Sequence, residues 1–448
     1  MTRERVAVFA CLLALQAIAM AAELVPTDRA EATATPSANG AANGDPQDAE
    51  EPDPASERAR EEIAEEVKLR ADEDPLAQQQ EAKQLEKKQA EEAAEPVPEL
   101  EEGLSGSAYG SARVRYRYTD SDNQIWGDGG SRVGLRGRWV YGPENSLFGW
   151  VEYGFNLLDS VDRLFNPGGT GSERARSGSF FPRLIYLGWE TPNNILTVGK
   201  NWSTYYQVAG WTDLMQGAGG SALGVYNANT DGGPTGTGRA DGTLQTRLSI
   251  DFLPEAWFEP FKLNVQIQNG RPIPQTESLD YGWAVGASTI LELENNYFAG
   301  LAINYAEVRD VGSPQAQAVS LRGDAQAYLL GLRKFSDDWY VAFGGARLVN
   351  HETTDQGTYF DGWGWEFYAH RRVAEKVWFG GGFNSLQPDA DQVQAQDYRV
   401  AYGLAELRYT FRTFSRMLFL NYRFERGSLQ SGEKIPNTLT VGIRWDFP

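Results

Sequence analysis

The feature that most restricts the fold is a change of sequence pattern after Leu104. From there on, segments of about ten residues alternate apolar and polar side chains, separated by clusters of Gly, Asn, Asp and Pro. In the first segment, residues 108–118, Val114 lies between Arg113 and Arg115. Successive side chains of a strand point to opposite faces, so one face of each segment is apolar and the other polar. The pattern predicts an all-β fold.

This alternation suits a soluble β-sandwich as well as a membrane barrel. Three observations favour the barrel. Aromatic residues such as Trp445 and Phe447 stand near strand ends, where a barrel has its interfacial girdles. Short polar turns, as at residues 142–145 and 191–194, alternate with longer loops. Cys11 is the only cysteine and lies in a predicted leader, so an exported chain of this size has no disulfide to stabilise it.

The number of segments predicts the size of the barrel. We expect about sixteen strands, because an even number suits a closed antiparallel barrel and this size leaves a lumen wide enough for water. The expected strands begin near residues 106, 131, 146, 180, 194, 242, 260, 280, 296, 324, 338, 358, 376, 396, 415 and 437.

The N-terminus has the pattern of a secretory signal peptide, predicted over residues 1–21. Arg3 and Arg5 precede an apolar run over residues 6–20, and the small-residue pattern at 19–21 suits cleavage. A membrane anchor is the alternative, but the run of about 15 residues is shorter than the ~20 that a spanning helix needs. The sequence therefore predicts export.

An acidic extension separates this leader from the barrel. Residues 22–54 are poor in apolar side chains and predict a disordered linker, whereas residues 55–104 are rich in helix-forming residues and predict a charged helical periplasmic extension. Residues 22–103 carry about 24 acidic and 8 basic side chains, so most of the net charge of −20 lies here. This charge argues against binding of nucleic acid. The predicted barrel, residues 105–448, carries only about −5.

The extension could be an oligomerising coiled coil or a solvated single helix. Asp74, Glu81 and Lys88 occupy positions where a coiled-coil seam requires apolar side chains. A solvated helix, with a periplasmic partner left open, is the favoured interpretation.

Several short segments resemble one known family. They are residues 131–135 (SRVGL), 151–155 (VEYGF), 182–184 (PRL), 198–201 (VGKN), 210–215 (GWTDLM) and 219–220 (GG), followed by Arg239 and Arg247. Their order and spacing over residues 105–448 resemble the trimeric general porins of Gram-negative bacteria. The resemblance implies a 16-stranded antiparallel transmembrane β-barrel, and the long stretch 203–241 matches that family's inserted constriction loop.

The resemblance also implies which residues line the constriction. The barrel wall would supply Arg132, Arg183 and Arg239, with Arg136 and Arg113 as inward-facing neighbours. The loop would supply Asp213.

Two positions depart from the family's pattern. Gly217 stands where a second loop carboxylate is usual, and Ser111 stands where the first strand usually has a lysine. Fewer carboxylates beside many arginines predict a preference for anions. The alternative is that the arginines only pair with inward acids and solvate the wall. Candidate partners are Glu152, Asp251, Glu406 and Asp446. The family's C-terminal aromatic signal corresponds to Phe447, although Pro448 follows it.

The resemblance implies an outer-membrane porin for passive diffusion of small hydrophilic solutes and ions. Its implied partners are outer-membrane lipid, lipopolysaccharide and two further copies in a homotrimer. The alternatives are a channel selective for phosphate, carboxylates or sugars, a barrel that anchors an envelope tether, and a soluble sandwich. Two distant histidines, His351 and His370, give little basis for an enzyme, a metal site or a cofactor.

Overall fold

The computed structural model describes residues 103–120, 124–142, 144–157, 180–216, 219–250, 261–293, 296–411 and 416–447. The predicted signal peptide, the linker and the extension up to residue 102 lie outside the described residues. Among the described residues, no helix is both long and apolar enough to cross a membrane.

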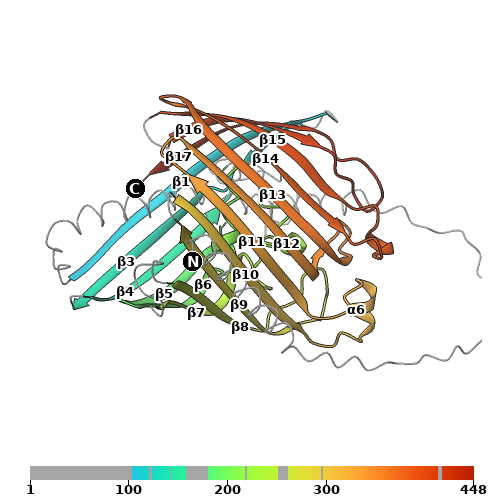
Figure 1. The fold of residues 1–448 in the computed structure, drawn as a ribbon, viewed down its shortest axis with the longest axis horizontal. Helices are drawn as coiled ribbons and strands as arrows, with labels where there is room; N and C mark the ends of the chain where they lie inside the picture. Colours follow the sequence, from blue (N-terminus) through green and yellow to red (C-terminus); the bar gives the residue numbers. More distant parts are fainter. Residues whose placement is uncertain are drawn as a thin grey trace, which may run out of the picture. The chain divides into compact units, whose positions relative to one another are not determined.

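The described chain is built almost entirely from strands (Figure 1). They are β1 (Gly103–Thr119), β2 (Gln124–Asp128), β3 (Arg132–Gly142), β4 (Asn145–Phe155), β5 (Phe180–Thr191), β6 (Asn194–Trp202), β7 (Arg239–Ile250), β8 (Phe261–Asn269), β9 (Tyr281–Leu293), β10 (Tyr297–Val308), β11 (Ala325–Phe335), β12 (Trp339–Thr353), β13 (Tyr359–Ala374), β14 (Val377–Pro388), β15 (Val400–Thr410), β16 (Arg416–Glu425) and β17 (Thr438–Phe447). The short helices are α5 (Tyr206–Ala209), α6 (Pro314–Ala318), η1 (Asn227–Asn229) and η3 (Val393–Ala395).

The sheet closes on itself. Each strand pairs antiparallel with its neighbours, and β1 completes the ring by pairing with β17 on one side and with β2 and β3 on the other. Since β2 and β3 both pair with the same side of β1, they are two parts of one barrel strand. The seventeen strands therefore form a closed 16-stranded barrel, which confirms the predicted fold class. Most strands begin within one residue of the predicted position. The largest differences are at the barrel strand formed by β2 and β3, which begins at residue 124 and not 131, and at β15, which begins at residue 400 and not 396.

The interruption between β2 and β3 has a local cause. The Asp128 carboxylate accepts hydrogen bonds from the backbone N–H of Gly130 and of Ser131, at 2.8 and 2.7 Å. Gly130 has a φ of 91°, which a residue with a side chain rarely adopts. The hydroxyl of Ser131 then accepts the backbone N–H of Arg113 at 2.9 Å. This turn was not predicted, because it depends on a side chain that competes with the strand for backbone hydrogen bonds.

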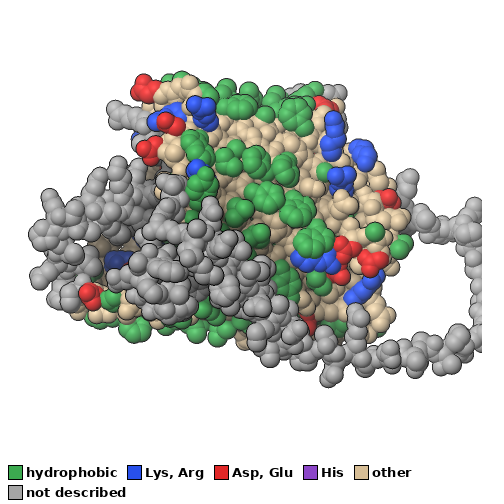
Figure 2. All heavy atoms as spheres, in the orientation of Figure 1, with side chains coloured by type: hydrophobic (Ala, Val, Ile, Leu, Met, Phe, Trp, Pro, Cys, Tyr) green, Lys and Arg blue, Asp and Glu red, His purple; other side chains and the backbone are tan. Residues whose placement is uncertain are grey.

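The outer face of the barrel is apolar and its inner face is polar. On β17, Val441 and Trp445 are exposed, whereas Thr440 and Arg444, each of which directly precedes one of them, are buried inside the barrel. Figure 2 shows hydrophobic side chains spread over the outer surface between charged side chains near the ends. A soluble sandwich would bury these side chains instead. The apolar outer face therefore supports the membrane barrel.

The two ends of the barrel differ in the length of their connections. Residues 192–193, 336–338 and 375–376 form short turns at one end, whereas long loops, among them residues 203–238 and 389–399, lie at the other. Outer-membrane barrels have short periplasmic turns and longer external loops. Gly103 pairs with Val140 at the short-turn end, so β1 enters the barrel from that end.

Candidate pore constriction

The loop of residues 203–238 follows β6 and folds into the barrel. Its first turn, α5, begins where the Tyr206 backbone N–H donates to the Ser203 hydroxyl at 2.9 Å. Trp211 and Leu214 then pack against the inner wall and are at most 1% exposed. The structure thus places a loop at the position of the predicted constriction loop.

The wall beneath this loop is shaped to receive it. Gly300 of β10 and Gly331 of β11 face the loop, and a Cβ atom on Gly331 would lie 2.6 Å from a methyl group of Val208. The guanidinium of Arg333 lies 4.7 Å from the centroid of a Trp211 ring. Large side chains of the loop therefore fill the space that small wall residues leave, and this packing forms an apolar core inside the barrel.

Buried polar groups fix the backbone of the loop. The Glu366 carboxylate on β13 accepts the Thr212 hydroxyl at 2.6 Å and the Ala222 backbone N–H at 2.7 Å. The Glu406 carboxylate on β15 accepts the backbone N–H of Gln216 at 2.8 Å. Buried carboxylates that accept backbone N–H groups hold a segment in one position, because an unpaired buried charge is costly.

The base of the loop is held by an ion pair. Asp231 lies 2.9 Å from the Lys200 ammonium and 3.7 Å from the Arg239 guanidinium. Burial acts to raise the pKa of Asp231, but Lys200 and Arg239 outweigh it and hold that pKa below its ordinary value. Its contribution to stability is therefore present above the unfolded pKa and is lost as the pH falls through the lower folded pKa. We expect the base of the loop to stay ionised at neutral pH.

A set of inward-facing arginines occupies the wall formed by β1, β3, β5 and β17. We call it the arginine cluster, and its members are Arg113, Arg115, Arg132, Arg183 and Arg444, each at most 8% exposed. The register places Ser111 opposite Arg132, and Arg113 opposite Arg444. Barrel closure thus brings arginines from both ends of the barrel sequence together.

Two carboxylates lie among these guanidinium groups. Glu152 is 2.8 Å from Nε of Arg183 and 3.5 Å from Nε of Arg132, and the Tyr109 hydroxyl donates to it at 2.6 Å. Asp446 is 2.7 Å from Arg444 and accepts the Ser111 hydroxyl at 2.5 Å. The cluster thus brings five guanidinium groups together with these two carboxylates.

The loop approaches this cluster through Gln216. Gln216 lines one small cavity together with Arg113, Arg115 and Arg444. Guanidinium groups of the barrel wall therefore face the inserted loop at this level.

The predicted site arginines fall into three places. Arg113, Arg132 and Arg183 lie together in the cluster. Arg136 lies on the same face of β3 but is exposed, bonded to Ser107 at 2.8 Å. Arg239 is buried at the base of the loop, with its guanidinium 5.6 Å from the centroid of a Trp202 ring.

Asp213, the predicted loop carboxylate, is 2% exposed. It accepts hydrogen bonds from the hydroxyls of Tyr226, at 2.6 Å, and Tyr206, at 3.2 Å. Gly217, which stands where the family usually has a second loop carboxylate, lies outside the described residues. The described part of the loop therefore presents its carboxylate to tyrosines of the same loop.

Sequence reasoning missed Arg115 and Arg444 as cluster members. The signal was present, because Arg115 shares the strand parity of Arg113, and Arg444 alternates with outward-facing residues of β17. The register between the first and last strands was needed to bring them together.

Among the possible partners that the alternative interpretation named, Glu152 and Asp446 do pair with cluster arginines, and Glu406 pairs with Arg408. Asp251 lies outside the described residues.

The two histidines lie inside the barrel. His351 lies near the end of β12 and is fully buried. His370 faces the barrel interior, where its Nδ1 lies 3.0 Å from the Tyr368 hydroxyl. Among the described residues, no group of three His, Cys, Asp or Glu side chains could hold a metal ion.

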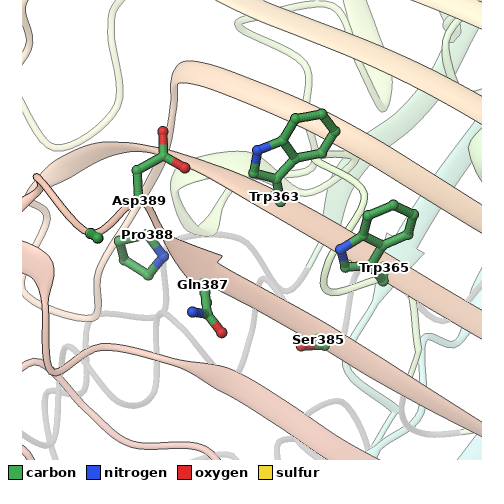
Figure 3. Close-up of a pocket in the computed structure, with 7 residues that line it drawn as sticks. Trp363, Trp365, Ser385, Gln387, Pro388 and Asp389 are labelled. Carbon is green, nitrogen blue, oxygen red and sulfur yellow. The ribbon is translucent and has the colours of Figure 1, made fainter.

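A second cavity, of about 350 Å³, lies on the outer face and not in the lumen. It is lined by Trp363 and Trp365 of β13, which project outward, and by Ser385 and Gln387 of β14 (Figure 3). Arg347 lies beside it and pairs with Asp389 at 2.7 Å. These side chains belong to the membrane-facing surface and take no part in the constriction.

The paired acid Glu152 provides a direct test of the cluster. We expect Glu152→Gln to shift the ratio of anion to cation permeability toward anions about two- to three-fold, because it removes a negative charge between Arg132 and Arg183. The reversal potential across a salt gradient measures this ratio. Glu190→Gln is the matched control, since Glu190 pairs with Arg138 outside the cluster. An unchanged ratio in Glu152→Gln would show that the cluster does not face the ion path.

Comparison with known proteins supports this description. No family model matches the chain. The sequence is 27% identical over 250 residues to the outer membrane porin F of Xenorhabdus nematophila, covering 52% of this chain and 59% of that protein. The match thus spans less than two thirds of the relative's length.

Solved structures share the fold. The OmpF of Salmonella typhi, solved with daunomycin, has a TM-score of 0.61 at 17% identity and covers 77% of this chain and 98% of its own. The anion-selective porin of Comamonas acidovorans has a TM-score of 0.53 at 14% identity, covering 77% of this chain and all of its own. The channel DcaP of Acinetobacter baumannii has a TM-score of 0.53 at 13% identity, covering 77% and 98%.

A closed 16-stranded barrel with an apolar outer face and an inserted loop has the architecture of an outer-membrane β-barrel. The sequence is similar to that of an outer membrane porin, and the fold is similar to that of solved porins, the family that the short segments resemble.

Proposed function

We propose that the protein is a porin through which small hydrophilic solutes and ions diffuse passively, with a preference for anions. The observation that carries the preference is the arginine cluster, in which five buried guanidinium groups lie together with the carboxylates of Glu152 and Asp446. An excess of positive charge at a narrow passage raises the local concentration of anions and lowers that of cations.

The other functional assignments follow from the same class. The chain would be exported by residues 1–21, inserted among outer-membrane lipid and lipopolysaccharide, and assembled as a homotrimer. The anion selectivity named for the Comamonas porin, which shares the fold, supports the proposed preference.

Single-channel recording tests the proposal. Detergent-purified protein in a planar bilayer should give discrete conductance steps, grouped in threes if the trimer inserts as a unit. The reversal potential across a salt gradient should tilt toward the anion. Conductance steps with a preference for cations would support a porin but contradict the proposed role of the arginine cluster. Folded protein that gives no conductance steps would contradict the proposed channel function.

A channel selective for phosphate, carboxylates or sugars is the second candidate, because guanidinium groups on β1, β3, β5 and β17 could bind an anionic solute in succession. Solute flux that saturates at low concentration would favour this candidate, whereas flux proportional to concentration favours passive diffusion.

A further inference from the structure

The cavity on the outer face has a polar side, although the surface around it is apolar. The register pairs Trp363 with Gln387 and Trp365 with Ser385 across β13 and β14, so each indole stands opposite an amide or a hydroxyl (Figure 3). Polar side chains on a lipid-facing surface are costly unless they find a hydrogen-bonding partner. The lining of the cavity thus differs from an ordinary membrane-facing surface.

The two tryptophans form one wall of the cavity, and β12 holds them in place. Their rings are stacked, with centroids 6.1 Å apart and an angle of 10° between the ring planes. Gly345 makes room for Trp365, because a Cβ atom there would lie 2.5 Å from that ring. Arg347 stands opposite Trp363, with its guanidinium 5.5 Å from the centroid of that ring. Both indoles nevertheless stay more than 40% exposed and so remain accessible to a ligand.

The polar groups around the cavity have no partner in the part of the chain that the structure describes. There, the two indole N–H groups, the Ser385 hydroxyl and the Gln387 amide make no hydrogen bond. Trp189, another tryptophan of the outer face, instead donates its indole N–H to the Tyr141 hydroxyl at 2.7 Å. Several donors and acceptors therefore converge on this cavity and are available to a bound molecule.

This combination of groups suits a sugar. The C–H groups on the face of a pyranose ring pack against an aromatic ring, while the hydroxyls at its edge bond to amide, hydroxyl and indole N–H groups. The volume of about 350 Å³ lies within the range of small-molecule sites. Asp389 in the lining is neutralised by Arg347, with two N–O distances of 2.7 and 2.9 Å. A neutral sugar ring therefore suits the cavity better than a charged group.

The position of the cavity indicates that such a sugar would belong to a lipid. Pro388 ends β14 at the long-loop end, so the cavity lies near the external membrane surface. Toward the middle of the barrel, the same two strands carry Phe367 and Phe383, whose stacked rings have centroids 5.9 Å apart, and the exposed Phe379. A headgroup in the cavity would place its apolar chains against these three rings.

We propose that this cavity is a binding site for the sugar headgroup of a glycolipid in the external leaflet, whose acyl chains lie along the phenylalanines. Such a site goes beyond the general contact of a barrel with lipid, because it distinguishes one headgroup from another. It lies outside the lumen and does not depend on which solutes pass through the pore.

Native mass spectrometry of the full mature chain in detergent tests the proposal, with lipid A, a glucosamine disaccharide lipid, as the probe. Trp363→Leu should weaken binding of lipid A about 10-fold, because it removes a stacking face and keeps the surface apolar. Trp283→Leu is the matched control, since both tryptophans are 49% exposed and Trp283 lies at the same end of the barrel, on β9. Equal weakening in the two variants would overturn the inference.

A change at the polar side of the cavity separates recognition of the sugar from contact with the acyl chains. Gln387→Leu removes the amide and should weaken binding of lipid A several-fold. Binding of phosphatidic acid, which has a phosphate and acyl chains but no sugar, should stay unchanged. If this variant weakened binding of both lipids equally, the headgroup would not be recognised and the proposal would be wrong.

Two controls assign a loss of binding to this cavity. Trp363→Leu and Gln387→Leu should keep the β-sheet circular dichroism of the unmodified protein, which shows that the barrel is folded. Light scattering should give the same number of subunits in all variants. If Trp363→Leu changed that number, the cavity would be a contact between copies of the chain, which contradicts a lipid site.

Discussion

Replacing Arg113, Arg132 and Arg183 together by glutamine should lower the ratio of anion to cation permeability by about 10-fold. A passage lined by charge of one sign enriches counter-ions by at least this order. Glutamine keeps polar groups and much of the side-chain length, so the change removes charge more than volume. The reversal potential of single channels across a salt gradient measures the effect.

Arg136→Gln is the matched control for this variant. Arg136 lies on β3 four residues from Arg132, on the same face, but is exposed and bonded to Ser107. We expect it to change the permeability ratio less than two-fold, because it lies outside the cluster. A triple variant that remains as anion-selective as the unmodified protein would show that selectivity arises elsewhere.

The second large effect is expected from a single methyl group. A Cβ atom at Gly364 on β13 would lie 1.6 Å from the backbone oxygen of Ala222 in the inserted loop, so one of the two must move. Gly364→Ala should weaken loop docking by about 1–3 kcal/mol, the usual cost of overpacking. The displaced loop should open the lumen, seen as a higher single-channel conductance with more frequent transitions between levels.

Gly380→Ala adds the same methyl group to the inner face of the neighbouring strand β14. Its nearest neighbours would lie at 3.4 Å, a distance that small adjustments accommodate. Conductance should stay as in the unmodified protein. If Gly364→Ala also left conductance and its fluctuations unchanged, the loop could not be narrowing the ion path.

The barrel was predictable because its signal is local. Each strand carries a period-two pattern within ten residues, as on β17, and turn residues mark the boundaries. The break between β2 and β3 escaped this reasoning, since the Asp128 carboxylate interrupts an otherwise continuous strand pattern. β15 also starts later than predicted, because the short helix η3 (Val393–Ala395) and the turn after it precede the strand.

The candidate constriction was less predictable. Resemblance led to Arg132 and Arg183, but Arg444 joins them only through closure between β1 and β17. The tyrosine partners of Asp213 lie in the same loop, seven and thirteen residues away, and no periodicity relates them. Glu366 anchors the loop across more than 140 residues of sequence, a contact that depends on the completed barrel.

The apolar core beneath the inserted loop has a consequence for the field inside the channel. Trp211, Leu214 and Leu223 fill one side of the lumen with material of low polarisability. Field lines from the guanidinium groups on the opposite wall cannot spread through that side and are concentrated in the remaining water. A few arginines can thus act on passing ions more strongly than the same number in a barrel filled evenly with water.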